Sequence, residues 1–321
     1  MLLTPRTRSV AVLPILIVAC SGGENPPPTL PGANGNELVI ASAPVMVGAG
    51  DIAVCGTSGD VATARLVDSV VRADSVAQLP SVVFTLGDNA YPSGPEGVQR
   101  DFERCFNTTW GTPRILSRIR PSPGNHDYDS GSADPYFDYF GERAGPRGKG
   151  YYSYDVGSWH VMSLNSELYF GYGTDAEVKA QEEWLRNDLQ RHRTLCALAY
   201  FHRPLFSSGV YGSSGGVRSL WEILFSGGVD LVLNGHEHDY ERFLPQTPAG
   251  VPDSVHGIEQ IISGTGGGDL RRIGYPVARN SAAQIQGRFG VLKLTLGDGQ
   301  YTHAFIDTTG KVWDPGSRHC H

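Results

Sequence analysis

The stretch Asn234-Gly-His-Glu-His-Asp-Tyr-Glu-Arg242 follows the apolar run Val229–Leu233 and carries two histidines, His236 and His238, on either side of one residue. In an extended chain alternate side chains share a face, so the two imidazoles can point the same way. Neutral imidazole is the commonest protein ligand for metal ions, and the glycine before the pair lets the backbone turn sharply into such a site. The pair is consistent with a metal site or with an ordinary loop that carries two polar rings. Matching ligands at the ends of other apolar runs would favour the metal site.

Four earlier apolar runs also end in potential metal ligands. They are Val45–Gly50, followed by Asp51; Val82–Leu86, followed by Gly87-Asp-Asn-Ala-Tyr91; a shorter run near Ile119, followed by Gly124-Asn-His-Asp127; and Leu195–Phe201, followed by His202. Ligands of open α/β sheets gather beyond the carboxyl ends of the strands, so we expect these residues to meet. Together the five runs supply seven oxygen and nitrogen donors and no thiolate: Asp51, Asp88, Tyr91, Asn125, His202, His236 and His238. Such a set suits hard or borderline metal ions and not a structural zinc site.

Helices are predicted between the strands at Val61–Val76, Asp175–Arg191 and Val217–Phe225, where apolar residues recur at helical spacing. This alternation of strand and helix is typical of an α/β fold. The C-terminal part differs, because three strand candidates follow one another with glycine-rich turns and no helix between them: Ile258–Ser263, Phe289–Leu296 and Tyr301–Ile306. We expect them to form a second, mostly antiparallel sheet. The glycine-rich segment 264–283 precedes no helix start, which favours an ordinary loop over a phosphate-binding loop.

Length and composition describe an ordinary globular protein. At 321 residues the chain fits one large α/β domain or two smaller ones, and 40% of its residues are hydrophobic. A formal net charge of −7 provides no basic field for holding nucleic acid, so nucleic-acid binding is not expected. Because no internal repeat and no composition break follows Pro44, we expect a single domain over residues 44–321 and no obligate protein partner.

Residues 1–19 have the form of an export signal. Two arginines precede the apolar run Val10–Ala19, which is too short to span a bilayer. The run ends in Ile17-Val-Ala-Cys20-Ser21, which resembles the lipobox of bacterial lipoproteins, where the cysteine is lipidated and becomes the first residue. An ordinary secretory signal with a chance cysteine is the alternative. We expect a protein exported to the bacterial cell envelope, periplasmic or at the cell surface, whose only contact with the membrane is a lipid anchor at Cys20.

Residues 20–43 are rich in Gly, Pro and Asn and lack periodicity, which predicts a disordered tether between the anchor and the domain. Four cysteines remain beyond Cys20: Cys55, Cys105, Cys196 and Cys320. An even number in an oxidising compartment indicates two disulfides, for which three pairings are possible. Of these we favour Cys55–Cys105 with Cys196–Cys320.

The five blocks in their order resemble the calcineurin-like metallophosphoesterase superfamily, and in particular its purple acid phosphatase-like branch. Most members of the superfamily have Asp-x-His in the first block, whereas Asp51-Ile-Ala53 lacks that histidine. The purple branch instead has a tyrosine three residues after the second aspartate, and Tyr91 stands at that position after Asp88. The resemblance covers the chain from about Pro44 to its end.

The resemblance implies a four-layer fold, in which two packed mixed β-sheets are flanked by helices. It also implies two metal ions. The first would be held by Asp51, Asp88, Tyr91 and His238, and the second by the bridging Asp88 with Asn125, His202 and His236. A tyrosine phenolate favours Fe(III) in the first position, beside a divalent iron, zinc or manganese ion in the second.

The implied reaction is the hydrolysis of phosphomonoesters by a metal-activated hydroxide. Two ions roughly 3.5–4 Å apart clamp the phosphoryl oxygens and lower the pKa of bound water to near neutrality. His126 is assigned to contacting phosphate and protonating the leaving oxygen, with orientation of Asp127 as its alternative role. Many relatives have a second histidine after the one matching His202, but this chain has Arg203, whose guanidinium either contacts phosphate or packs in the loop.

Three other functions have to be weighed against this sequence. A phosphodiesterase would use the same core, and the loops 131–149 and 207–216 are expected to set the choice of substrate. A non-catalytic surface protein is disfavoured because the ligands are intact in all five blocks. A glycan hydrolase with paired carboxylates would not need four histidines and a tyrosine in this order.

Overall fold

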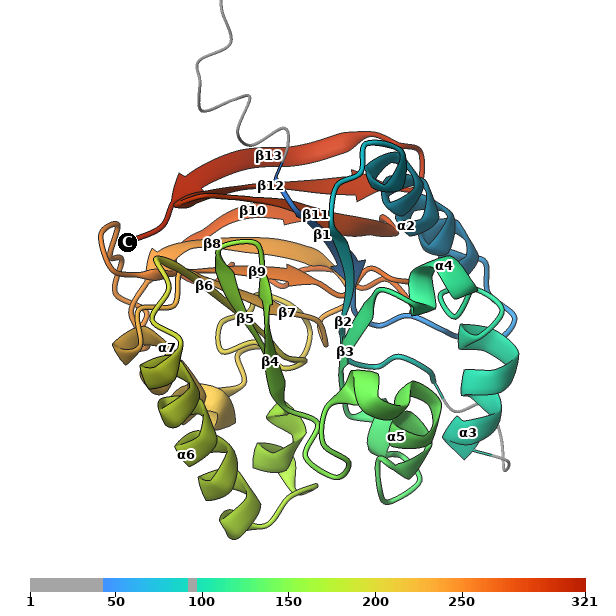
Figure 1. Ribbon diagram of the computed structural model, residues 1–321, viewed down its shortest axis with the longest axis horizontal. Helices are drawn as coiled ribbons and strands as arrows, with labels where there is room; N and C mark the ends of the chain where they lie inside the picture. The colour runs from blue at the N-terminus through green and yellow to red at the C-terminus, as the bar shows by residue number, and fades with distance from the viewer. Residues whose placement is uncertain (1–42, 92–96) are drawn as a thin grey trace, which may run out of the picture. The chain divides into compact units, whose positions relative to one another are not determined.

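The computed structural model describes residues 43–91 and 97–321 (Figure 1). The strands are β1 (Val45–Ala49), β2 (Ser81–Leu86), β3 (Ile119–Ser122), β4 (Tyr152–Val156), β5 (Trp159–Ser163), β6 (Cys196–Tyr200), β7 (Leu231–Asn234), β8 (Tyr240–Gln246), β9 (Ile258–Ser263), β10 (Ser281–Ile285), β11 (Gly290–Gly297), β12 (Gln300–Asp307) and β13 (Val312–His319). The α-helices are α2 (Gly59–Val76), α3 (Gly97–Asp101), α4 (Pro113–Leu116), α5 (Asp134–Phe140), α6 (Asp175–Arg191) and α7 (Arg218–Ser226). The predicted signal at residues 1–19, Cys20 and the tether up to residue 42 lie outside the described residues.

The strands form two mixed sheets. The first has the order β13-β12-β11-β1-β2-β3 and the second the order β10-β8-β9-β7-β6-β5-β4. In the first sheet β1, β2 and β3 are parallel, and in the second β5, β6, β7 and β9 are parallel. Every residue of β1 and of β6 is buried, as expected for parallel strands covered on both faces. The parallel strands of each sheet therefore bring their carboxyl ends to a common edge.

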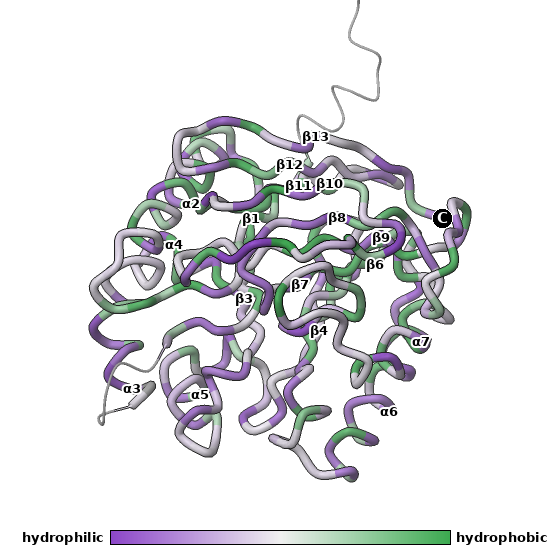
Figure 2. The backbone as a smooth tube through the Cα atoms, turned by 180° about the vertical axis from the view of Figure 1, so that it is seen from behind, coloured by the Kyte–Doolittle hydropathy of each residue, from purple (hydrophilic) through white to green (hydrophobic). Residues whose placement is uncertain are grey.

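Three hydrophobic cores separate four layers. The central core lies between the sheets and is formed by residues of both, among them Met46, Phe84, Leu292, Trp159, Leu198 and Leu231. Helices α2 and α5 cover the outer face of the first sheet, and α6 and α7 cover that of the second (Figure 1). In Figure 2 the tube of α2, α6 and α7 alternates between hydrophobic and hydrophilic residues, as amphipathic helices do. This is the α/β/β/α arrangement that the family resemblance implied.

Local patterns located the main elements well. Helix α6 spans Asp175–Arg191 as predicted, because Thr174 and Glu177 form a capping box at its start and Leu185 and Leu189 are buried. The expected separate C-terminal sheet was wrong. Strand β9 pairs in parallel with β7 in the second sheet, whereas β11 and β12 extend the first sheet through an antiparallel pair with β1. Strands β4, β8, β10 and β13 were not predicted.

The structure contains both favoured disulfides, Cys55–Cys105 and Cys196–Cys320. The first links the loop after β1 to the helical segment that covers the first sheet. The second ties β6 to the last residues of the chain. Among residues 43–91 and 97–321, no helix combines the length and the apolar composition needed to cross a membrane.

Candidate metal centre

The seven predicted donors meet at the common carboxyl edge of both sheets. Asp51, Asp88 and Asn125 follow β1, β2 and β3, and His202 and His236 follow β6 and β7. A hydrogen bond from the Gly50 amide to the Ser263 carbonyl, 2.9 Å long, joins the two sheets at this edge. The site is therefore assembled from distant segments, since the His236 amide donates at 2.9 Å to the carboxylate of Asp51, 185 positions earlier in the chain.

Three of these donors have a left-handed backbone. The φ angles are +59° at Asp51, +49° at Asp88 and +69° at His236. Such angles are uncommon outside glycine, and the strain they represent persists where the surrounding structure and a function require it. The two histidines do not lie in an extended segment, because residues 236–239 form a series of bends between β7 and β8.

One group of donors surrounds Asp51. Its Oδ1 atom lies 3.0 Å from the Tyr91 hydroxyl and 3.2 Å from His238 Nε2. The hydroxyl and Nε2 are themselves 3.1 Å apart. Asp51 and His238 are buried and Tyr91 is half-buried, so these three polar atoms converge in a largely enclosed position. They are three of the four ligands assigned to the first ion.

A second group surrounds His202 Nε2. This atom lies 3.2 Å from Asn125 Oδ1, 3.3 Å from Asp88 Oδ2 and 3.2 Å from His236 Nδ1. These are the four ligands assigned to the second ion. Donor atoms of Asp51, Asp88 and His202 all lie within 4.8 Å of one another, so Asp88 is close to a member of each group, as a bridging ligand must be.

Backbone carbonyls set the orientation of two imidazoles. His202 Nδ1 donates to the Leu86 carbonyl at 2.7 Å, and His238 Nδ1 donates to the Asp269 carbonyl at 2.6 Å. A proton on Nδ1 leaves the lone pair of Nε2 directed into the site in the neutral ring. This outer hydrogen bond is the usual support of a metal-binding histidine.

Glycines allow the donor segments to pack this closely. A Cβ atom on Gly87 would lie 2.5 Å from His202 Nδ1, and one on Gly235 would lie 2.7 Å from Asp51 Oδ2. Carbon atoms cannot approach side chains to such distances. The glycines before Asp88 and His236 thus have a steric function, in addition to the sharp turn that we predicted for the second of them.

The charges of the site are unbalanced without cations. Burial lowers the pKa of His202, but the nearby Asp88 outweighs burial and raises it to about 10. Burial lowers the pKa of His236 to about 2, with support from the positive charges of His202 and Arg203. Burial and the Asp51 carboxylate raise the pKa of Tyr91 well above its ordinary value. A metal ion at His202 would compete with the proton that this raised pKa favours.

The donors fit metal ions in chemistry as well as in position. Carboxylate, amide and imidazole donors without a thiolate match iron, zinc and manganese. The two groups converge on separate points, around Asp51 and around His202, and share Asp88. The residues assigned from the sequence could therefore hold two cations.

His126 lies beside the first group without joining it. Its ring is 4.5 Å from that of Tyr91, and its side chain is 34% exposed. Its Nδ1 pairs with Asp129 Oδ2 at 2.6 Å and not with Asp127. Asp127 is held by the Gly124 amide and by Asn89. The exposed face of His126 is available to a ligand at the centre.

A pocket of about 490 Å³ opens beside the second group, lined by Asn125, Phe170, Arg203, Tyr211, Ser213, Ser214, Gly215 and His236. The Tyr211 ring stacks on His236 with centroids 4.7 Å apart, and the guanidinium of Arg271 lies 4.4 Å above Tyr211. The loop 207–216, which we expected to influence substrate choice, thus forms one wall. The loop 131–149 contributes none of these lining residues.

Sequence patterns did not single out Tyr211, Arg271 or Glu167 as parts of the site. Tyr211 and Arg271 lie in glycine-rich loops, well beyond the strand ends where the ligands were sought, and Glu167 follows β5 in a short helical turn. The exposed tyrosine in the loop after His202 was the only available signal.

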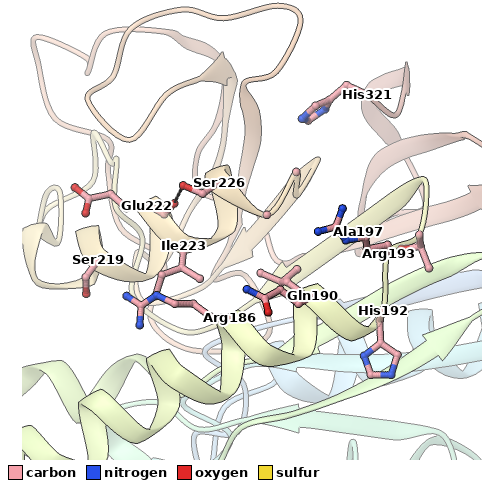
Figure 3. Close-up of a pocket in the computed structure, with 14 residues that line it drawn as sticks. Arg186, Gln190, His192, Arg193, Ala197, Ser219, Glu222, Ile223, Ser226 and His321 are labelled. Atoms are coloured by element: carbon pink, nitrogen blue, oxygen red, sulfur yellow. Dashed lines mark hydrogen bonds between the residues drawn. The ribbon is translucent and has the colours of Figure 1, made fainter.

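A larger pocket, about 690 Å³, lies between α6 and α7 and contains none of the predicted site residues (Figure 3). Figure 3 shows Arg186 and Gln190 of α6 on the side of Ile223 of α7, and all three residues line the pocket. It lacks a convergent set of metal donors.

The comparisons with known proteins agree on one family. The sequence profile of the calcineurin-like phosphoesterase family matches residues 44–240. Acid phosphatase type 7 of Homo sapiens is 29% identical over 285 residues, 76% of this chain and 62% of the relative. Purple acid phosphatase 21 of Arabidopsis thaliana is 29% identical over 234 residues, 67% of this chain and 49% of the relative.

The fold has a solved counterpart in a purple acid phosphatase from seeds of yellow lupin, Lupinus luteus. The TM-score is 0.70 at 20% sequence identity, over 87% of this chain and 54% of that chain. This likeness concerns the fold. The chain spans 62% or less of the lengths of these relatives.

Proposed function

Because this chain belongs to the calcineurin-like phosphoesterase family, we propose that it is a binuclear metal-dependent phosphatase acting on phosphomonoesters. The observation that carries the proposal is the convergence of two donor groups, around Asp51 Oδ1 and around His202 Nε2, on either side of Asp88. Tyr91 in the first group supports Fe(III) there, with a divalent iron, zinc or manganese ion in the second.

When bound, two ions would polarise the phosphoryl oxygens and lower the pKa of a water molecule, and would stabilise the transition state by several kcal/mol. The protein supplies the remaining elements. Asp88 and Asp51 contribute carboxylates that lie close to each other and to His202, and both residues have a left-handed backbone. His126 would donate a proton to the leaving oxygen, a role supported by its partly exposed ring, which lies against Tyr91 and pairs with Asp129.

Hydrolysis of phosphodiesters by the same centre is the second candidate, since both reactions use the same donors. The pocket beside Asn125 and His236 is open enough for either ester. We also propose that the protein is exported and lipid-anchored at Cys20. Two disulfides in the domain support export, because disulfides persist in oxidising compartments.

The test is turnover by the His236→Ala variant. Removing one imidazole from the second donor group should lower the rate at saturating phosphomonoester by on the order of 10²–10³-fold, the equivalent of several kcal/mol. His192→Ala is the matched control, because His192 is a largely exposed histidine at the end of α6 and outside the centre. Full activity of His236→Ala would refute the two-ion mechanism. Faster turnover of a diester than of a monoester by the unaltered protein would favour the second candidate.

A further inference from the structure

Arg203 is a fixed cation at the edge of the pocket beside the second donor group. Its Nε donates to both oxygens of Glu167, at 2.9 and 3.1 Å, and Glu167 is completely buried. One face of the guanidinium lies on the Phe170 ring, with Cζ 4.5 Å from the ring centroid. A buried carboxylate and an aromatic face thus hold the plane of this group, which is more than packing in the loop requires.

The pocket side of the guanidinium still has donors to offer. Nη1 lies 3.1 Å from His236 Nε2, and Nη2 has no hydrogen-bond partner within residues 43–91 and 97–321. The side chain is 16% exposed and lines the pocket. If His236 uses Nδ1 as a metal ligand, its neutral ring carries the proton on Nε2 and cannot accept from Arg203. Nη1 would then also need an acceptor in the pocket.

We propose that Arg203 binds a non-bridging oxygen of the substrate and thereby selects phosphomonoesters over phosphodiesters. This inference rests on the proposed phosphatase function. A monoester has three non-bridging oxygens and a charge between −1.5 and −2 near pH 7, whereas a diester has two such oxygens and a single charge. If two oxygens face the metal positions, only a monoester has a third for the guanidinium. A diester carries an ester group there, which accepts hydrogen bonds poorly and bears no charge.

Glu167 is the positioning residue in this arrangement. Its carboxylate is not among the groups that line the pocket but pairs with Arg203, which is, and the Arg203 amide donates to Ser166 Oγ at 3.1 Å. Glu167→Gln keeps the shape of the side chain but removes the ion pair. We expect this variant to weaken monoester selection in the same direction as a change at Arg203, and to a smaller extent.

The experiment compares Arg203→Gln with the unaltered protein, both loaded with metal and checked for equal metal content. Calorimetry gives the dissociation constants of inorganic phosphate and of dimethyl phosphate, and steady-state kinetics give kcat/KM for a monoester and a diester. Phosphate binding and monoester kcat/KM should each fall by about 10- to 100-fold, as expected for hydrogen bonds to a charged group. Dimethyl phosphate binding and diester kcat/KM should change less than about twofold, because neither presents the third oxygen.

Two further variants separate this effect from folding and from net charge. Arg203→Lys keeps the charge but cannot maintain both the Glu167 pair and the contact with substrate. Its phosphate affinity and its kcat/KM for the monoester should therefore lie between those of the unaltered protein and those of Arg203→Gln. Arg193→Gln removes an arginine from the distant pocket of Figure 3 and should leave all four quantities unchanged.

Equal losses for monoester and diester, or unchanged phosphate binding in Arg203→Gln, would overturn the inference and leave the phosphatase function standing. Absence of turnover of either ester by the unaltered protein would instead defeat the proposed function. The phosphate and dimethyl phosphate dissociation constants would in that case still decide whether Arg203 is the selective anion contact.

Discussion

Gly87 gives the sharpest test of how the fold supports the donors. It has a φ of +82°, and a Cβ atom there would lie 2.5 Å from His202 Nδ1. Gly148 has a φ of +81°, lies at the surface, and a Cβ atom there would have no neighbour within 4 Å. Gly87→Ala and Gly148→Ala therefore share the backbone cost of alanine in a left-handed conformation. Only the first also displaces a donor.

The free energy of unfolding separates the backbone cost from the cost of displacing His202, because the two add at Gly87 and only the first applies at Gly148. The shared backbone cost is about 1–2 kcal/mol. At Gly87 the added methyl group must push His202 off the Leu86 carbonyl, and leaving a buried group unpaired costs about 1–3 kcal/mol more. Loss of that outer hydrogen bond should also lower metal affinity at the second position by about 10- to 100-fold.

Urea unfolding of the metal-free proteins measures the first effect, and calorimetric titration with a divalent ion measures the second. We expect Gly87→Ala to be less stable than Gly148→Ala and to bind the ion more weakly, whereas Gly148→Ala binds it like the unaltered protein. Equal stability and equal metal affinity in the two variants would refute the steric role of Gly87.

Other features of the chain give four further predictions. Replacing Cys196 and Cys320 by serine opens a link across 124 positions and should cost about 5 kcal/mol of stability in denaturant titrations, and an unchanged unfolding midpoint would contradict this. Burial lowers the pKa of His160, but contacts with two aspartates outweigh burial and raise it above its ordinary 6.5. The ion pairs of His160 therefore stabilise the fold fully below about pH 6.5 and lose effect as the pH rises through the raised pKa. The destabilisation by His160→Gln, about 3–5 kcal/mol for one partner of a buried pair, should accordingly be larger at pH 5.5 than at pH 9, and a pH-independent difference would contradict this. Iron-loaded protein should show a visible phenolate absorption band that Tyr91→Phe abolishes, and a colourless iron-loaded protein would count against Fe(III) at that position. Cys20→Ser should move the protein from the membrane fraction to the soluble fraction, and an unchanged distribution would argue against lipidation.

The donor residues could be predicted from the sequence because each one is a local feature. Asp51, Asp88, Asn125 and His202 each follow an apolar run, and parallel strands bring their ends to one edge. The partner of each strand is not local. Strand β11 has the same apolar pattern whether it pairs with β1 or with β9, so the assignment of the C-terminal strands to one separate sheet failed.

The supporting residues of the site were out of reach for a similar reason. The Leu86 and Asp269 carbonyls orient two imidazoles, yet a carbonyl group has no sequence signature. Glu167 holds Arg203 from a different segment of the chain, and that pair is visible only once β5 and β6 are aligned in the second sheet. In the sequence Arg203 stands out as a departure from the family pattern. In the structure the pocket, the buried Glu167 carboxylate and the Phe170 ring give its guanidinium a definite orientation.

The most direct test of the binuclear centre is the metal content of the purified domain. Elemental analysis after removal of loosely bound ions should find two ions per chain in the unaltered protein, consistent with the donor groups around Asp51 and His202. A value of one or zero after saturation with iron and zinc would contradict the account.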